Sequence, residues 1–171
     1  ARHVGAGDRA GARIALVQCL MLGGLLALAT LVLAVAAGPL LLRGLGLPAD
    51  SAALARRYLA IVLPALPAIL VIHVGVAGLR GAGAMVSGLV AMTVVNLVNA
   101  AASFALATGW RGLPRLGWEG LAWGTVAGYV CGAVCVIGLI ARDRDGLRPA
   151  WSDWRLRRWW SRWILRIGVP A

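Results

Sequence analysis

Lysine is absent from this chain, and acidic residues are scarce. All 17 basic residues of the 171-residue sequence are arginines, against six acidic residues, so the formal net charge is +11. The cysteines Cys19, Cys131 and Cys135 are odd in number and lack histidine or carboxylate neighbours at ligand spacing. We expect them to be small packing residues that define no disulfide framework. Arginine without lysine, with abundant alanine, glycine, leucine and valine, is typical of a GC-rich bacterial genome.

Charge is also absent from four long apolar runs, which cover residues 14–42, 58–79, 82–108 and 121–141. Each can cross a bilayer, because a membrane helix needs about 20 apolar residues. The chain is 61% hydrophobic and its mean hydropathy is +0.84, whereas a soluble domain is about 45–50% apolar. The sequence therefore predicts an all-α, polytopic membrane helix bundle over residues 14–142.

Catalytic and cofactor-binding patterns are missing as well. The sequence shows no nucleophile–base pair, no metal-ligand cluster and no phosphate-binding loop, since the Gly81–Gly83 turn follows no strand and precedes no Lys-Ser/Thr pair. The positive charge lies in the gaps between the runs and forms no nucleic-acid-binding motif. We therefore expect neither an enzyme nor a nucleic-acid-binding protein, and no cofactor.

The arginines in the gaps predict an orientation. Twelve lie on one side of the membrane and five on the other, the five being Arg43, Arg56, Arg57, Arg111 and Arg115. The positive-inside rule places the richer side in the cytoplasm. Residues 1–13 are then a cytoplasmic loop and residues 143–163 a cytoplasmic linker, which supplies most of the bias. Tryptophan and arginine interleave over 151–163, which favours either an interfacial helix or an ordinary positive loop.

Both ends of the chain look cut, and residues 164–171 read as the start of a further helix. We therefore expect a fragment of a longer protein.

A narrow polar stripe lies on the third run. Met92, Asn96, Asn99 and Ser103 fall within about 60° of one another at helical spacing. An asparagine in hydrocarbon is costly unless its amide is paired, so the stripe must face protein or a watery cavity. It predicts either hydrogen bonds between helices or a wall that binds a cation or substrate. In the fourth run, the hydroxyl of Thr125 either bonds its own backbone or reaches into such a cavity.

The second and fourth runs contain further marked positions. Pro64 and Pro67 interrupt the second run, which predicts a bent helix that is either a hinge or a static kink. His73, in the same run, is either a neutral paired side chain or part of a proton relay. A glycine at every fourth position of the fourth run predicts close helix packing, the positions being Gly120, Gly124, Gly128 and Gly132.

Several short motifs, in order, resemble those of the multidrug and toxic compound extrusion (MATE) transporters, especially the branch of the DNA-damage-inducible F proteins. Residues 4–12 resemble the loop after helix 2, Tyr58 with Pro64 and Pro67 resembles helix 4, and Asn96–Asn99 resembles the N-x-x-N of helix 5. The remaining motifs are the LRG-G turn at 78–83, the helix 6 start at 116–125 and the helix 7 opening at 167–171.

The resemblance implies helices 3–6, and the first turns of helix 7, of a twelve-helix transporter with two lobes and cytoplasmic termini. Such a protein sits in the bacterial inner membrane and exports small organic, often cationic, compounds by alternating access, driven by Na⁺ or H⁺. Its partners are the bilayer, its substrates and the second lobe of the same polypeptide.

The resemblance also implies a cation site on this lobe. Asn99 and Thr125 match an asparagine and a threonine of that site, with Asn96, Ser103 and Met92 beside them in the cavity. Ser103 stands where cation-coupled members have an aspartate, and the family's other aspartate lies on helix 1. A hydroxyl supplies a ligand but no charge. Two alternatives stay open: a lipid-linked oligosaccharide flippase of the same superfamily, and a membrane scaffold that transports nothing.

Overall fold

The computed structural model describes residues 2–142 and 146–155, and these are largely helical. The long helices are α2 (Arg9–Gly44), α3 (Ala49–Val62), α4 (Leu66–Gly81), α5 (Met85–Thr108) and α6 (Trp118–Ala141), after a short α1 (Arg2–Gly5). Single 3₁₀ turns lie at η1 (Leu63–Ala65), η2 (Trp110–Gly112) and η3 (Trp151–Asp153). Four helical segments are long and apolar enough to span a membrane: α2, α3 continued by α4, α5 and α6. The predicted all-α bundle is confirmed.

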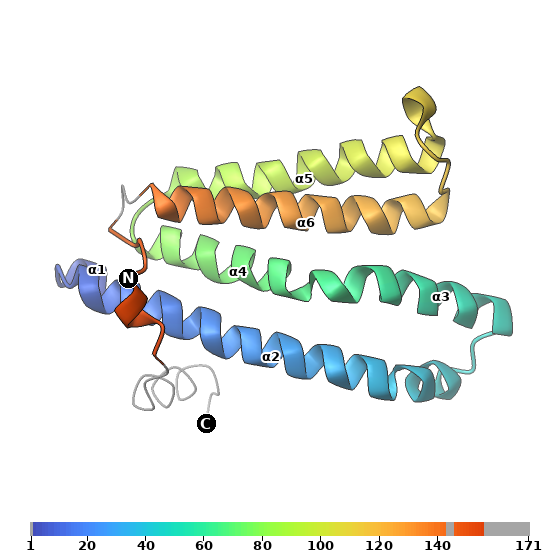
Figure 1. Cartoon of the computed structure of the whole chain (residues 1–171), viewed down its shortest axis with the longest axis horizontal. Coiled ribbons are helices and arrows are strands. Elements are labelled where there is room, and N and C mark those ends of the chain that lie inside the picture. Colours follow the sequence, from blue (N-terminus) through green and yellow to red (C-terminus); the bar gives the residue numbers. More distant parts are fainter. Residues whose placement is uncertain (1, 143–145, 156–171) are drawn as a thin grey trace.

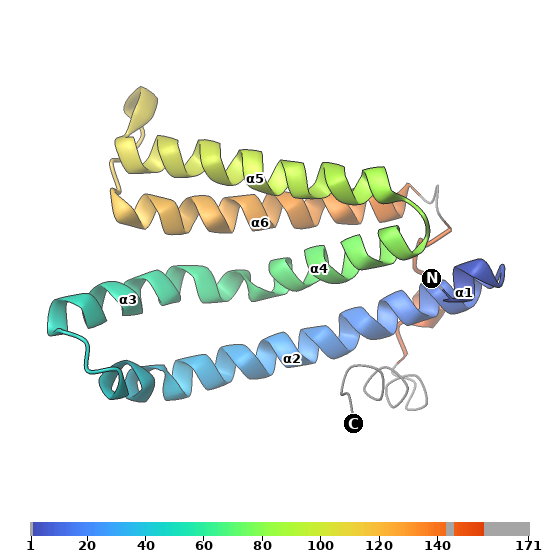
Figure 2. The ribbon, with the colours of Figure 1, turned by 180° about the vertical axis from the view of Figure 1, so that it is seen from behind.

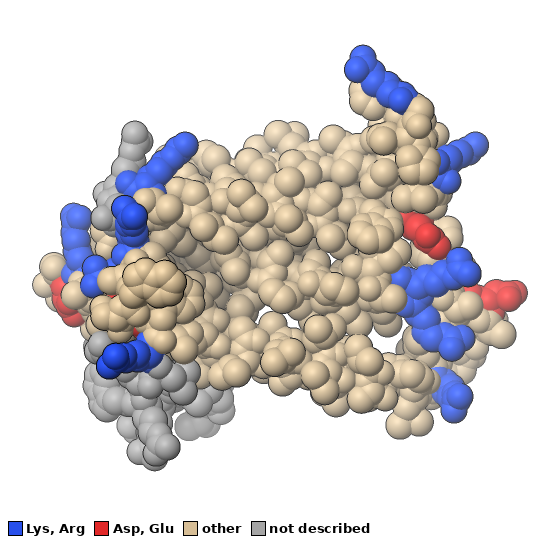
Figure 3. All heavy atoms as spheres, viewed as in Figure 1, with Lys and Arg blue, Asp and Glu red and all other residues tan. Residues whose placement is uncertain are grey.

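The spans lie roughly antiparallel in a row. α5 and α6 lie side by side, α4 lies next to α6, and α2 lies on the far side of α4 (Figures 1 and 2). We call the end where α2 begins and α6 finishes the first end of the bundle, and the opposite end the second end. Arginine and acidic side chains gather at these two ends, and the surface between them is apolar (Figure 3). This distribution is that of a multi-pass membrane protein.

The second span is one helical segment interrupted at its prolines. Pro64 lies in η1 and Pro67 lies in the first turn of α4, where a missing backbone N–H costs least. The segment starts at Ala49, earlier than the apolar run that begins at Tyr58. The reason is that Arg56 and Arg57 continue the helix, because long basic side chains can extend toward the headgroups.

The first end of α2 is fixed by a capping carboxylate. Gly11 N–H donates to Asp8 Oδ1 at 2.8 Å, and the His3 ring lies 2.9 Å from Asp8 Oδ2. The hydrogen bond from the Gly11 backbone, followed by the one to His3, lowers the pKa of Asp8 below its ordinary value. This cap starts α2 at Arg9, within the stretch 1–13 that the sequence predicted as a loop.

The chain after α6 folds back over the first end of α2, and we call residues 146–155 the return segment. Leu147 is buried in the core. Arg13 Nε donates to the buried Asp153 at 2.6 Å, and Gln18 Nε2 donates to the Arg155 carbonyl at 2.7 Å. The return segment is therefore part of the packed structure. The rest of the tryptophan–arginine stretch, 156–163, and residues 164–171 lie outside the described residues.

Candidate functional site: the seam between α5 and α6

The closest helix packing in the described chain lies between α5 and α6, and we call this contact the seam. A Cβ atom built on Gly120 would lie 2.5 Å from Ala107 N, and one built on Gly124 would lie 2.5 Å from Ser103 N. The same construction on Gly128 meets the Val95 carbonyl oxygen at 2.8 Å. Such distances are far inside van der Waals contact, so only glycine lets the two backbones approach this closely.

Three polar side chains form a hydrogen-bonded trio at the middle of the seam. Ser103 Oγ donates to Asn99 Oδ1 at 3.1 Å, and Asn99 Nδ2 donates to Thr125 Oγ1 at 3.4 Å. Thr125 Oγ1 in turn donates to the Leu121 carbonyl at 2.9 Å. The threonine therefore bonds its own backbone and accepts from the neighbouring helix at the same time. We call Asn99, Ser103 and Thr125 the polar trio.

The trio is held in place by the glycines opposite it. Gly124 faces Ser103, and Gly128 faces the Cβ and backbone of Asn99. With no side chain at either glycine, the two α5 side chains lie against the α6 backbone and can reach Thr125. The close packing at the glycines is therefore what allows Asn99 to form its hydrogen bond with Thr125.

The chemistry of the trio is that of neutral oxygen ligands. Asn99 Oδ1, Ser103 Oγ and Thr125 Oγ1 all carry lone pairs, and none of these side chains titrates near neutral pH. Among the described residues, no group of three histidine, cysteine or acidic side chains is placed to hold a metal ion. The trio can donate to a polar group or contribute oxygens to a monovalent cation, but it cannot accept a proton at physiological pH.

Two other residues of the predicted stripe lie elsewhere. Met92 packs against the apolar core, and the Asn96 side chain is exposed. The contact line on α5 runs through positions four apart, and each such step turns about 40° around the helix. One turn before Asn99, the α5 residue that faces α6 is Val95. Asn96 follows Val95 in the sequence, so its side chain points about 100° away from the α5–α6 contact. The stripe therefore leaves the seam before it reaches Asn96.

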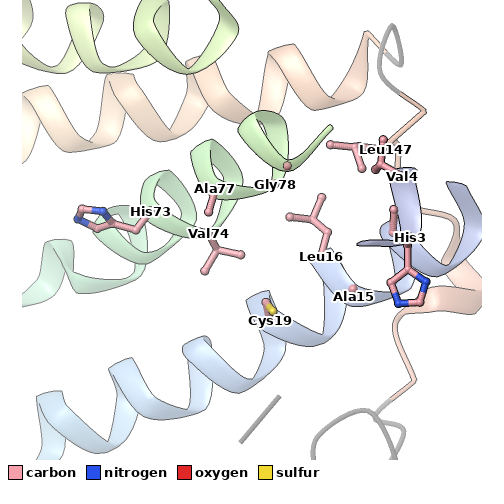
Figure 4. A pocket seen from close by; sticks show the side chains of 12 residues that line it. His3, Val4, Ala15, Leu16, Cys19, His73, Val74, Ala77, Gly78 and Leu147 are labelled. Atoms are coloured by element: carbon pink, nitrogen blue, oxygen red, sulfur yellow. The ribbon is translucent and has the colours of Figure 1, made fainter. Parts of the chain in front are cut away.

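His73 lies in a separate cleft between α4 and the first end of α2. This cleft has a volume of about 430 Å³, and His73 and His3 mark its opposite ends, with Leu16, Cys19 and Val74 between them (Figure 4). No carboxylate is among the residues that line it. The structure therefore does not bring His73 together with the polar trio.

One polar residue that sequence reasoning missed is Gln18, which is fully buried. It donates to a backbone carbonyl of the return segment, 137 positions away in the sequence. The available signal was a lone glutamine within the first apolar run, a residue type that is costly in hydrocarbon unless it is paired.

A family model described as MatE matches residues 1–105, which include Asn99 and Ser103 of the polar trio and end before α6. No curated protein and no solved structure matches the chain.

Proposed function

This chain belongs to the MatE family, and from that membership we propose that its helices form part of the first lobe of an antiporter that exports small organic compounds. Membership identifies a MATE-type membrane transporter, a class whose members are generally not enzymes. The proposal adds the direction of transport, the substrate class, and the correspondence of α2, α3–α4, α5 and α6 to helices 3–6 of a twelve-helix protein of the DNA-damage-inducible F branch.

The polar trio is the observation that supports this function. It joins α5 and α6, whose backbones approach most closely, inside two apolar spans. Hydrogen bonds between membrane helices contribute only about 0.6–2 kcal/mol each, and the glycines opposite already hold the helices together. Of the three hydrogen bonds, only the one from Asn99 to Thr125 crosses the seam, so lone pairs on the three side-chain oxygens remain for a bound cation.

The same chemistry suits Na⁺ rather than H⁺ as the ion that the trio itself binds. A proton-coupled site needs a group that titrates near neutral pH, and none of the three side chains does. Neutral oxygens suit a hard monovalent cation. The balancing charge would come from a carboxylate on another helix, and the resemblance implies an aspartate on helix 1 of the complete transporter.

The proposed orientation places the first end of the bundle in the cytoplasm of a bacterial inner membrane. The arginine bias between the two ends supports this assignment. Alternating access would bend the second span at η1, where Pro64 already interrupts the helix.

Efflux by the Asn99→Ala variant of the complete transporter tests the function. Alanine keeps the Cβ that packs on Gly128 but removes both hydrogen bonds of the amide. We expect Na⁺-driven efflux of a fluorescent organic cation to fall at least about tenfold, since about 1.4 kcal/mol of lost cation binding gives that factor. Thr93→Val is the matched control, because Thr93 is exposed on the same helix.

Expression and thermal stability of both variants are measured in parallel. Normal efflux by Asn99→Ala would contradict the role of the trio. Wild-type efflux that responds to a proton gradient and ignores Na⁺ would contradict the choice of ion. A wild type that moves no organic cation would instead favour the scaffold interpretation.

A further inference from the structure

The second span joins two halves that are held in the bundle very differently. The buried residues of α4 are Ile72, Gly75, Val76 and Leu79. A Cβ on Gly75 would overlap the Val136 side chain of α6, so α4 packs closely on that helix. In the described part of the chain, no residue of α3 is buried. α4 is therefore fixed to the bundle, whereas α3 extends from it toward the second end without a buried anchor (Figure 1).

The junction between the two halves, η1, is a point where the helix bends at low cost. Proline has no N–H, so Pro64 cannot donate a hydrogen bond to the Ala60 carbonyl four positions earlier. A bend here therefore breaks no hydrogen bond between these two residues. A cleft of about 170 Å³ separates α2 from α3, with Pro39 on one wall and Leu59 on the other. Helix α3 thus has room to turn from α6 toward α2.

An ion pair connects α3 to α6 at the second end. Arg57 Nη1 donates to Glu119 Oε1 at 3.3 Å. Glu119 lies in the first turn of α6, where the helix dipole favours a carboxylate. Its side chain is 30% exposed, so the pair is screened less than one that lies wholly in water. Arg57 precedes Pro64 by about 10 Å of helix, and a bend at η1 would therefore separate Arg57 from Glu119.

We propose that α3 is a hinged arm, and that the Arg57–Glu119 ion pair latches it against α6 at the second end. When the pair is formed, α3 lies against α6 and the second end is closed between these helices. When the pair is broken, α3 pivots at η1 toward α2 while α4 keeps its place. The use of this movement as a gate on the second side of the membrane rests on the proposed function, but the movement itself does not.

Distances between spin labels, measured by double electron–electron resonance, test the arm. The complete transporter, with its native cysteines replaced by alanine, carries labelled cysteines at the exposed positions Ala53 of α3 and Thr108 of α5. The Arg57 side chain is 71% exposed, and breaking so exposed a pair shifts a two-state equilibrium by up to about fivefold. We expect Arg57→Gln to raise the population of a second Ala53–Thr108 distance by that factor. A reference pair at Ala77 of α4 and Thr108 should keep its distance.

Three further variants separate the ion pair and the hinge from a general loss of charge. Arg56→Gln is the matched control, because Arg56 Nε donates to the Ala52 carbonyl of its own helix at 3.4 Å. It should leave the distances as in the wild type. Arg57→Gln combined with Glu119→Gln should shift the distances no further than Arg57→Gln alone, since both remove the same contact. Pro64→Ala restores the missing N–H and should reduce the second population in the Arg57→Gln background.

The latch and the hinge can each fail on their own. An unchanged Ala53–Thr108 distribution in Arg57→Gln, or an equal shift in Arg56→Gln, overturns the latch. A matching change in the reference distance would mean that the whole bundle loosens, and this also overturns it. An undiminished second population after Pro64→Ala overturns the hinge. None of these readouts depends on transport, so a failed efflux experiment leaves them valid, and fixed distances in a protein with normal efflux would reject the arm alone.

Discussion

The α5–α6 pair and the long helix α2 are packed in opposite ways, although the most hydrophobic stretch of α2 is the more apolar. The most hydrophobic window of α2 has a mean hydropathy of 2.5 and no buried residue, whereas that of α6 has 2.0 and is 33% buried. The buried residues of α2 all lie between Gly11 and Gln18. Beyond them, leucines and valines such as Leu26, Leu33 and Leu40 face outward.

The difference shows what drives helix association in a bilayer. Leucine gains little by leaving lipid for protein, because both surroundings are hydrocarbon. A glycine at the contact lets two helix backbones approach closely. The helices then gain van der Waals attraction between many pairs of atoms. α6 has glycines at the seam and a hydrogen-bonding threonine, whereas α2 is held mainly at its first end, by an ion pair, a buried glutamine and a cap. Composition therefore predicts which helices span, and glycines spaced four residues apart, with a polar side chain that can pair across the contact, predict which helices pack closely.

Placing a large side chain in the seam should produce the largest effect. Gly124→Leu forces α6 away from the Ser103 backbone, and overpacking of this kind costs about 3 kcal/mol. We expect loss of the monodisperse protein in size-exclusion chromatography, or a large drop in its melting temperature. Gly38→Leu, where a Cβ meets nothing within 4 Å, makes the same change on α2 and should cost almost nothing. Equal stability of the two variants would show that the seam is not the tighter contact.

The packed first end of α2 gives the next largest effect. Asp153 is 2% exposed and its carboxylate accepts hydrogen bonds from Arg13 and from the Ala150 N–H. Arg13→Gln removes this arginine from the buried carboxylate. Since the Arg13 side chain is itself 32% exposed, we reduce the usual cost of a broken buried pair to about 2 kcal/mol. Arg43→Gln, at the exposed far end of the same helix, is the control. Thermal unfolding in detergent measures both, and equal melting temperatures would refute this account of how α2 is held.

The sequence predicts the spans well because the evidence for them is local. Runs without charge give four membrane helices, and the structure confirms the all-α bundle. Helix limits are predicted less well. The second span begins at Ala49 because helical structure continues through Arg56 and Arg57, and a count of apolar residues stops at those arginines.

The site is predicted only in part, because contacts between helices are not local. The proximity of Asn99 and Thr125 was expected from the family resemblance, and their hydrogen bond joins residues 26 positions apart. The exposure of Asn96 follows from the drift of the contact line around α5, which requires the helix partner to be known. The pairing of Arg13 with Asp153, 140 positions apart, has no signal in a single sequence.

The smallest effect should come from the cap of α2, and it should depend on pH. The pKa of Asp8 is lowered below 3.8 by the hydrogen bonds from the Gly11 N–H and from His3. The ionised carboxylate of Asp8 is therefore more stable in the folded chain than in the unfolded chain. That stabilisation is present above the unfolded pKa and is lost as the pH falls through the lowered, folded pKa. Asp8→Ala should therefore speed hydrogen exchange at the Gly11 amide at neutral pH. In strong acid, the exchange rate at Gly11 should be the same in the variant and in the wild type.

The control is Asp50→Ala, in the first turn of α3, which leaves exchange at Gly11 unchanged. A difference at Gly11 that persists once Asp8 is protonated would mean that the carboxylate is not what holds the start of α2, and the contacts to the return segment would then account for its order alone.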